Sequence, residues 1–239
     1  MPHSVHSTRE SSPMPAEELS AKYWNFNVPR ERWTEECPTF LQGLPEKSKR
    51  VLSSYDGDYV QTTWDEAKAL ININRIDLFQ RSPTALRRYL KFMHDLKKQH
   101  GSVMAFVQQH RLHWASATPS ADPPFSNPAD YKILYNDWPY GVDPDIVHLV
   151  VWTKFNLEDD PATDDLTSKA RQEIEEFVVR TFCGEDGIAR DQLIWFKNWS
   201  SLKSIHALEH FHVMLYKPSS AFVKKITGGD RPISATVTE

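Results

Sequence analysis

The sequence predicts an α+β fold: one domain with a small, mostly antiparallel or mixed sheet covered by helices, and a helical block at its N-terminal end. Helical patterns come first, between residues 63 and 110. Strand patterns follow between residues 131 and 216, in the order strand, strand, helix, strand, strand. The 239 residues show no internal repeat and no second core, so a single domain is expected.

The two ends of the chain differ in composition from its middle. Residues 1–20 are rich in Ser, Pro and His and lack the apolar run of a secretory signal, so we expect a disordered tail there. The domain is expected to span residues 21–218, and residues 219–239 to form a loose C-terminal tail. Residues 23–60 are rich in proline and aromatic residues without periodicity, which indicates an irregular arm docked on the main body.

Three helices are expected in the N-terminal half, and each has a start signal. Their expected ranges are 63–80, 83–100 and 102–110. Thr63 and Glu66 have the spacing of a capping box, in which each side chain bonds the other residue's backbone N–H. Ser82 precedes a proline at the first helical position, and Ser102 has a similar capping position. Gly101 is a typical helix stop.

The C-terminal half contains four expected strands and one amphipathic helix. The strands are expected at 132–135, 146–155, 192–198 and 208–216, and the helix at 165–182. The strand at 146–155 has the strongest pattern, because apolar residues dominate it for ten positions. An 18-residue loop at 113–130, rich in Pro, Ser, Ala and Asp, is long for a compact domain and hints at a binding loop.

Alternation along the strands predicts one core face and one polar, aromatic face. Side chains on a strand point to opposite faces in turn. The expected core face carries Val147, Leu149, Val151 and Phe155. The opposite face carries His148, Val150, Trp152 and Lys154, and we expect it to be joined by Leu193, Trp195 and Lys197 from one neighbour and His210, His212 and Met214 from another. This face would form the floor of a site for an anionic or aromatic ligand; the alternative is a solvated sheet face.

Histidines in the last strand allow two further interpretations. His206, His210 and His212 could share a metal with Asp137 or Glu209, but hydrogen-bonded structural histidines are the expected outcome, and no metal site is predicted. A general-base role for His210 or His212 is the other interpretation, because imidazole titrates near neutral pH. Four aspartates at 159–165 do not have the spacing of a calcium loop.

Two more segments are candidates for binding or catalysis. Asn136–Gly141 is a turn signature, which either connects two strands or holds Asp137 and Tyr140 as an acid/base pair at the mouth of the sheet. The helix at 83–100 has an excess of basic residues, of which Arg87, Arg88, Lys91 and Lys98 lie roughly on one side. Such a surface is either simply solvated or contacts phosphate groups.

Composition excludes several classes of function. With eight glycines the chain has no glycine-rich phosphate loop, so no cofactor is expected. The two cysteines, Cys37 and Cys183, fit free thiols in a reducing compartment. No apolar run approaches the length of about 18 residues that spans a membrane. The net charge of −4 argues against nucleic-acid binding through bulk charge.

Several segments resemble the fungal N-acetylglucosamine-induced protein family. They are Tyr23–Asn25, Arg81–Leu90, Asn136–Gly141, His148–Phe155 and Trp195–His212, within residues 20–218. This family is associated with the fungal arginine-containing cyclodipeptide synthases, which combine arginyl-tRNA with a second aminoacyl-tRNA to make a cyclic dipeptide. The Asp-Asp-x-x-Glu motif of those synthases is matched here only by Asn136–Tyr140, which keeps one of its three acids.

The resemblance implies an aminoacyl-tRNA-dependent cyclodipeptide synthase in the cytoplasm. Because the ester is already activated, such an enzyme needs mainly positioning and proton transfer. Asp137 would hold the substrate amine or guanidinium, and Tyr140, His210 and His212 complete the implied catalytic group. The implied substrate-binding residues are Asn136, Trp138, His148, Trp152, Lys154, Trp195, Lys197 and Glu209, and the implied tRNA contacts are Arg87, Arg88, Lys91 and Lys98. The alternative is a non-catalytic binding or regulatory protein of the N-acetylglucosamine response.

Overall fold

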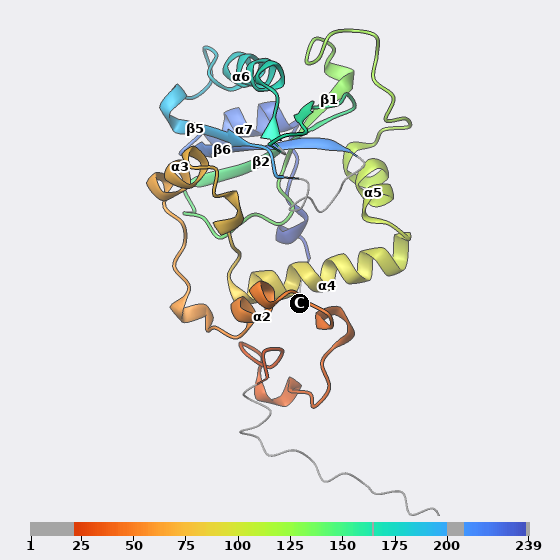
Figure 1. Cartoon of the computed structure of the whole chain (residues 1–239), viewed down its shortest axis with the longest axis vertical. Helices are drawn as coiled ribbons and strands as arrows, with labels where there is room; N and C mark the ends of the chain where they lie inside the picture. Colours follow the sequence, from red (N-terminus) through yellow and green to blue (C-terminus); the bar gives the residue numbers. More distant parts are fainter. Residues whose placement is uncertain (1–21, 164, 200–207, 238–239) are drawn as a thin grey trace, which may run out of the picture.

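An antiparallel sheet of four strands lies at the centre of the fold, as a computed structural model shows for residues 22–163, 165–199 and 208–237 (Figure 1). Its strands are β1 (Tyr131–Tyr135), β2 (Ile146–Thr153), β5 (Leu193–Phe196) and β6 (Glu209–Tyr216), in the order β1-β2-β6-β5. Two short strands, β3 (Asp159–Asp160) and β4 (Asp165–Leu166), form a separate ladder. The predicted α+β class and antiparallel sheet are confirmed.

Helices cover both faces of the sheet (Figure 1). The described helices are α2 (Glu46–Leu52), α3 (Trp64–Asn72), α4 (Pro83–His100), α5 (Val103–Phe106), α6 (Ser168–Phe182) and α7 (Ser220–Thr227). A π-helical turn (Val107–Leu112) extends α5. Short 3-10 turns lie at Arg30–Arg32, Thr39–Leu41, Asp56–Asp58, Ile76–Leu78, Pro128–Asp130, Arg190–Gln192 and Ile233–Ala235. None of the described helices is long and apolar enough to cross a membrane.

The capping signals are confirmed, with one change at a helix end. Thr63 and Glu66 form both bonds of the capping box, Ser82 caps α4, and Gly101 ends α4 at φ 73°. Helix α3 stops at Asn72 rather than near residue 80, because Asn74 adopts a left-handed φ of 52°. Asparagine tolerates this conformation better than most residues, so the chain turns there.

The expected core face of the sheet is confirmed. Leu149 and Val151 of β2 are fully buried, and they pack with Phe177 of α6 and Phe222 of α7 in the larger apolar core. The other face packs against the N-terminal helices: α4 and α5 cover Val150 and Trp152, and α3 covers the neighbouring end of β2. Because its covering layer consists of helices from the first half of the chain, this second face is not open to solvent.

The C-terminal segment is not a loose tail in residues 220–237. Ser219 caps α7, and Phe222 and Val223 are buried against the sheet. Asp230 then accepts a two-pronged hydrogen bond from Arg111. The sequence prediction was wrong here because a helix of eight residues has only a short apolar pattern, and its partner surface comes from distant strands.

The N-terminal arm docks on α4, as predicted. Arg87 donates a hydrogen bond to the backbone oxygen of Trp24, and Leu41 and Leu52 are buried at 0% and 1% exposure. The hydroxyl of Tyr59 donates to the backbone oxygen of Gly141, and a Cβ on that glycine would lie 2.1 Å from the hydroxyl. The turn after β1 therefore needs glycine where the arm approaches it. The expected tail at 1–20 lies outside the described residues.

Candidate functional site

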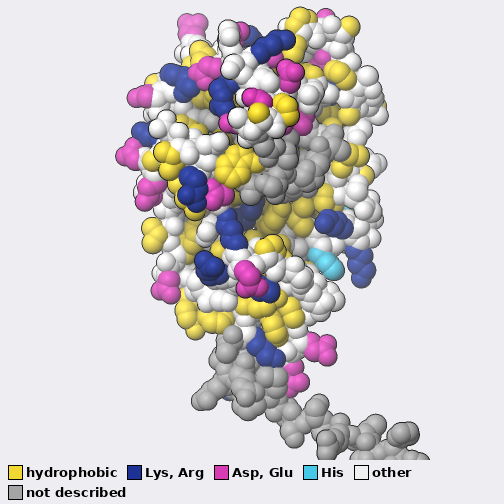
Figure 2. All heavy atoms as spheres, viewed as in Figure 1, with side chains coloured by type: hydrophobic (Ala, Val, Ile, Leu, Met, Phe, Trp, Pro, Cys, Tyr) yellow, Lys and Arg dark blue, Asp and Glu magenta, His cyan; other side chains and the backbone are white. Residues whose placement is uncertain are grey.

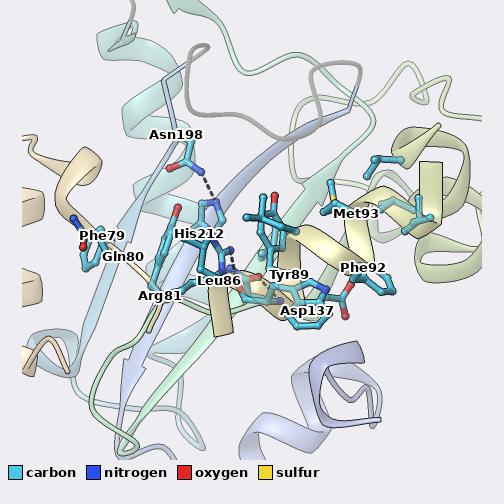
Figure 3. Close-up of a pocket in the computed structure, with 18 of the residues that line it drawn as sticks. Phe79, Gln80, Arg81, Leu86, Tyr89, Phe92, Met93, Asp137, Asn198 and His212 are labelled. Carbon is cyan, nitrogen blue, oxygen red and sulfur yellow. Dashed lines mark hydrogen bonds between the residues drawn. The ribbon is translucent and has the colours of Figure 1, made fainter. Parts of the chain in front are cut away.

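A cavity of about 340 Å³ lies between helix α4 and the polar face of the sheet (Figure 3). Its floor includes Val150, Trp152, His210 and His212 from β2 and β6. Its walls come from α4, α5 and the turn after β1. The apolar side is lined by Phe92, Met93, Leu96, Val103, Phe106 and Val107, and the polar side by Arg81, Asn136, Asp137, Tyr140, Asn198 and His212. The cavity is therefore amphipathic, and it lies on the face that alternation predicted.

Two histidines form a buried hydrogen-bonded pair under the polar side. Nε2 of His148 lies 3.0 Å from Nδ1 of His212, and the amide nitrogen of Asn198 lies 3.0 Å from Nε2 of His212 (Figure 3). When the Asn198 nitrogen donates to Nε2, the proton of His212 is on Nδ1 and is donated to His148. Both ring nitrogens of His212 are thus hydrogen-bonded to other side chains, and its proton-transfer role stays a prediction.

Burial keeps this pair uncharged. It lowers the pKa of His148 from 6.5 to about 3, and the nearby charge of Arg81 acts in the same direction. The pKa of His212 also lies well below its usual value, first because of burial and then because of its cationic or titratable neighbours. Tyr140 packs against His148, and burial raises the pKa of its hydroxyl. The polar side therefore consists largely of neutral groups at physiological pH.

Arg81 brings a positive charge to these neutral groups. Its guanidinium donates to the backbone oxygen of Trp138 through Nε at 3.1 Å and Nη2 at 2.5 Å. It lies over the rings of Tyr89 and Tyr140, at 4.2 and 5.1 Å from the ring centres. Among the described residues, no carboxylate forms an ion pair with Arg81. The side chain is therefore held in place without a counter-ion.

Two buried polar atoms of the cavity lining lack a hydrogen-bond partner in the described part of the chain. They are the indole nitrogen Nε1 of Trp138 and the amide oxygen Oδ1 of Asn198. The two residues are 6% and 7% exposed. A buried polar atom without a partner costs about 1–3 kcal/mol, so native proteins normally satisfy such atoms. One donor and one acceptor are thus available to a bound molecule.

Asp137 is bound by the protein's own arginine. Its Oδ2 accepts from Nε of Arg111 at 2.9 Å, and its Oδ1 accepts from the backbone N–H of Ile233 at 2.9 Å. Arg111 also pairs with Asp230, whose Oδ2 accepts from the backbone of Tyr135. Both carboxylate oxygens therefore have partners within the protein, and the role of Asp137 in holding a substrate guanidinium stays a prediction. Its expected acid/base partner Tyr140 instead packs on Phe79 and His148.

Five of the expected substrate-binding residues do not line the cavity: His148, which lies beneath its polar side, and four residues that lie elsewhere. Trp195 pairs with Val213 in the register of β5 and β6, so it points to the α6 face and donates to Glu175. Lys197 and Glu209 form an ion pair at 3.3 Å, and Lys197 also pairs with Asp159. Lys154 follows the end of β2 and lies over the ring of Trp114. Directly paired residues share a face, so the expected coincidence is confirmed for β2 and β6, where His148 pairs with Met214 and Trp152 with His210. It was wrong for β5, because Phe196 rather than Trp195 pairs with His212.

The remaining expected residues line the cavity or support its floor. Asn136, Trp138, Trp152 and His210 line it, and Asn136 also lies 3.2 Å from Nε2 of His148. The ring of His210 stacks on Trp152 at 4.5 Å, and its Nδ1 donates to the backbone oxygen of Leu208. Among the described residues, no cluster of three metal-ligating side chains occurs. His206, a candidate ligand, lies outside them.

The basic residues of α4 serve mainly internal contacts. Arg87 bonds the N-terminal arm, and Arg88 donates to the backbone oxygens of Ser234 and Val237. Lys91 pairs with Asp95, and Lys98 is exposed. Figure 2 shows Lys and Arg side chains interspersed with Asp and Glu on the face in view, rather than gathered in one field. The expected phosphate-binding side of the helix is thus partly used to hold both ends of the domain.

The match to a known family covers the sheet and the helices around the cavity. Residues 63–216, more than half of the chain, match the family described as "Protein of unknown function (DUF3605)". The chain belongs to the DUF3605 family. The matched region of this DUF3605 protein contains Arg81, Trp138, Asn198 and both buried histidines, whereas the arm and α7 lie outside it.

Two relatives of this DUF3605 protein support the same assignment. N-acetylglucosamine-induced protein 1 of Candida albicans is 30% identical over 226 residues, which cover 87% of this chain and 83% of the relative. Uncharacterized protein YPL067C of Saccharomyces cerevisiae is 26% identical over 164 residues, covering 66% and 81%. The resemblance to N-acetylglucosamine-induced proteins is thereby confirmed. A solved structure, "Crystal Structure of HTC1", shares the fold at a TM-score of 0.54 and 23% identity, and the match covers 70% of this chain and 96% of that one.

Four residues in or beside the cavity of the DUF3605 protein were not predicted from the sequence. Arg81 stood in a segment of family resemblance, but a lone arginine before a helix N-cap has no distinctive pattern. Asn198 was included in a strand, although β5 ends at Phe196. Arg111 and Asp230 are 119 positions apart, so no local signal could connect them.

Proposed function

We propose that this DUF3605 protein is a non-catalytic binding protein, whose cavity takes a small molecule with one polar end and one apolar end. The shape of the cavity supports this proposal, since apolar side chains line one side and hydrogen-bonding groups the other. Such a division is typical of small-molecule sites, where a few polar groups orient a largely apolar ligand. The neutral histidine pair stabilises the floor of this site and takes no part in chemistry.

The unpartnered atoms of Trp138 and Asn198 carry the proposal. In the described residues, the other fully buried nitrogen and oxygen atoms of side chains have hydrogen-bond partners. The ring nitrogens of His212, for example, are paired with His148 and Asn198. The two exceptions both belong to residues that line one cavity. A ligand with an acceptor for the indole N–H and a donor for the amide oxygen would satisfy both.

The proposed setting is the response to N-acetylglucosamine. The Candida albicans relative is named N-acetylglucosamine-induced protein 1, after its induction by the sugar. We carry the setting to this chain as part of the proposal, with the bound molecule acting as the signal or cargo. A regulatory protein of this kind would act in the cytoplasm, where metabolites of the sugar are formed.

Ligand-induced stabilisation tests the proposal. The melting temperature should rise with at least one of four classes of compound: N-acetylglucosamine, its phosphate, aromatic carboxylates and aliphatic carboxylates, since a ligand that binds only the folded state stabilises it. Met93→Trp should abolish the rise, because the larger side chain would fill the apolar side. Lys97→Gln, an exposed change on the same helix, is the matched control and should keep it. The absence of any shift across the panel would contradict the proposal.

The second candidate is an aminoacyl-tRNA-dependent cyclodipeptide synthase, which the Asn136–Gly141 segment favours. The cavity could take an aminoacyl group, and Lys98 remains exposed for a tRNA contact. The engagement of Asp137 by Arg111 and of His212 by two side chains is unfavourable to this candidate. Mass spectrometry after incubation with arginyl-tRNA and a mixture of charged tRNAs tests it, and an arginine-containing cyclic dipeptide would make it the leading function.

A further inference from the structure

We propose that the ligand of this cavity is a carboxylate with an apolar tail and with an N–H or O–H donor close to its acid group, as in an N-acylated amino acid. The inference rests on the proposed binding function and names the chemical class of the ligand. Three observations carry it: the charge of Arg81, the acceptor on Asn198 and the apolar side of the cavity.

The charge of Arg81 selects an anion. A guanidinium has five N–H donors, and the hydrogen bonds to the backbone oxygen of Trp138 use only two of its nitrogens. The titratable groups that its charge affects are Tyr59, Tyr140, His148 and His212, all of which are neutral at physiological pH. A carboxylate would provide the counter-ion that the described residues lack, and planar donors match its geometry.

The amide oxygen of Asn198 selects a donor beside the acid. Arg81 and Asn198 both act on Tyr140: the first lies over its ring, and the second hydrogen-bonds its hydroxyl. Both side chains therefore contact Tyr140 and line the same cavity, in which Figure 3 labels them, so we infer that one polar head group meets both. Oδ1 of Asn198 is an acceptor without a partner in the described residues, so it requires an N–H or O–H from the ligand.

The opposite side of the cavity selects an apolar tail. Leu96, Val103 and Val107 are buried there, and Phe92, Met93 and Phe106 pack around them. A sugar phosphate would satisfy Arg81 but would place hydroxyl groups against this surface, at a cost of about 1–3 kcal/mol for each one left without a partner. An acyl chain or an aromatic ring would instead gain from its burial. The chemistry of the lining thus favours an acylated amino acid over an amino-sugar phosphate.

Three matched compounds test the inference by isothermal titration. N-octanoylglycine has the acid, the amide N–H and the tail; octanoylglycinamide lacks the charge, and octanoate lacks the amide. N-octanoylglycine should bind at least about tenfold more tightly than octanoylglycinamide, because one charge-assisted hydrogen bond corresponds to about that ratio. It should also bind more tightly than octanoate. N-acetylglucosamine phosphate should bind more weakly than all three.

Variants separate the role of Arg81 from a general loss of structure. Arg81→Gln should weaken N-octanoylglycine about tenfold and leave octanoylglycinamide within about twofold, so the neutral compound reports that the cavity is intact. Lys98→Gln, an exposed cation on the same helix, should change neither. Equal binding of the acid and the amide to the wild type would overturn the inference while leaving the proposed function in place. Binding of none of the compounds, with stabilisation by a sugar phosphate, would overturn the inference alone, and no binding by any compound would overturn both.

Discussion

At His148 and His212, burial decides which chemistry is available. An imidazole with a pKa of about 3, as in His148, is a weak base, and both nitrogens of His212 already have protein partners. The pair resembles a structural hydrogen-bond network more than a catalytic one. With the pair neutral, the charged side chains of the cavity lining are Arg81, Lys47 and Asp137. Because Asp137 is already paired with Arg111, an anion is the ligand that we propose for this site.

The same pair should make the protein sensitive to mild acid. In the unfolded chain a histidine titrates near pH 6.5, whereas burial lowers the pKa of His148 to about 3 in the folded chain. As the pH falls below 6.5, protons therefore bind the unfolded chain first, and the free energy of unfolding should decrease by up to about 1.4 kcal/mol per pH unit for each buried histidine. Above pH 6.5 the pair should contribute no pH dependence.

Urea denaturation between pH 7.5 and about pH 5 measures this effect. In His148→Gln the free energy of unfolding should change less steeply with pH, because one buried histidine no longer contributes. This holds even if the substitution lowers the free energy of unfolding at every pH. The control is His113→Gln, because that imidazole is exposed and should not alter the slope. An unchanged slope in His148→Gln would show that the buried pair does not titrate between the two states.

Among the elements, one ion network joins three parts of the chain that are distant in sequence. Arg111 lies in the π-helical turn after α5, Asp137 in the turn after β1, and Asp230 after α7. The side chain of Arg111 is 13% exposed, and those of its partners are 23% and 11% exposed. Removal of one member of such a buried set leaves the remaining charges without a counter-ion, which strongly destabilises the folded state. Replacement of the whole set by apolar residues would cost less.

Arg111→Leu should therefore lower the free energy of unfolding by about 3 kcal/mol, since two buried carboxylates lose their counter-ion. Urea denaturation measures the loss. The matched control is Arg75→Leu, which removes an arginine from an exposed pair with Asp77 and should leave the unfolding midpoint nearly unchanged. A small loss in Arg111→Leu would mean that the C-terminal segment is held by apolar contacts of α7 alone.

At the scale of the whole molecule, the ends of helices could be predicted from the sequence, whereas the pairing of β5 with β6 could not. Thr63, Ser82 and Gly101 act on their own helix ends, so their roles could be inferred from neighbouring residues. Trp195 was assigned to the wrong face, because its orientation depends on how β5 pairs with β6, where its partner is the distant residue Val213. Asp137 was correctly placed beside the sheet, but its partner Arg111 could not be found without the fold. The cavity was predicted as a face, and only the structure shows α4 covering it.

We expect the N-terminal arm to unfold together with the sheet, although the family match begins after the arm, at residue 63. Leu41 and Leu52 are fully buried between the arm and α4, as completely as Leu149 is in the sheet. Without the arm, the outer side of α4 would lose its cover, and the helix that closes the cavity would be held on one side only. The arm should therefore contribute to stability as core residues do.

Leu52→Ala tests this view, because loss of a buried leucine side chain typically lowers the free energy of unfolding by about 3 kcal/mol. If the arm and the sheet unfold together, this variant and Leu149→Ala should both shift a single transition, followed by urea titration with circular dichroism and tryptophan fluorescence. Lys49→Ala, on the same helix α2 but more exposed, is the control and should leave the transition in place. A separate early transition, seen only by fluorescence and shifted only by Leu52→Ala, would instead show that the arm opens independently and can expose the cavity from that side.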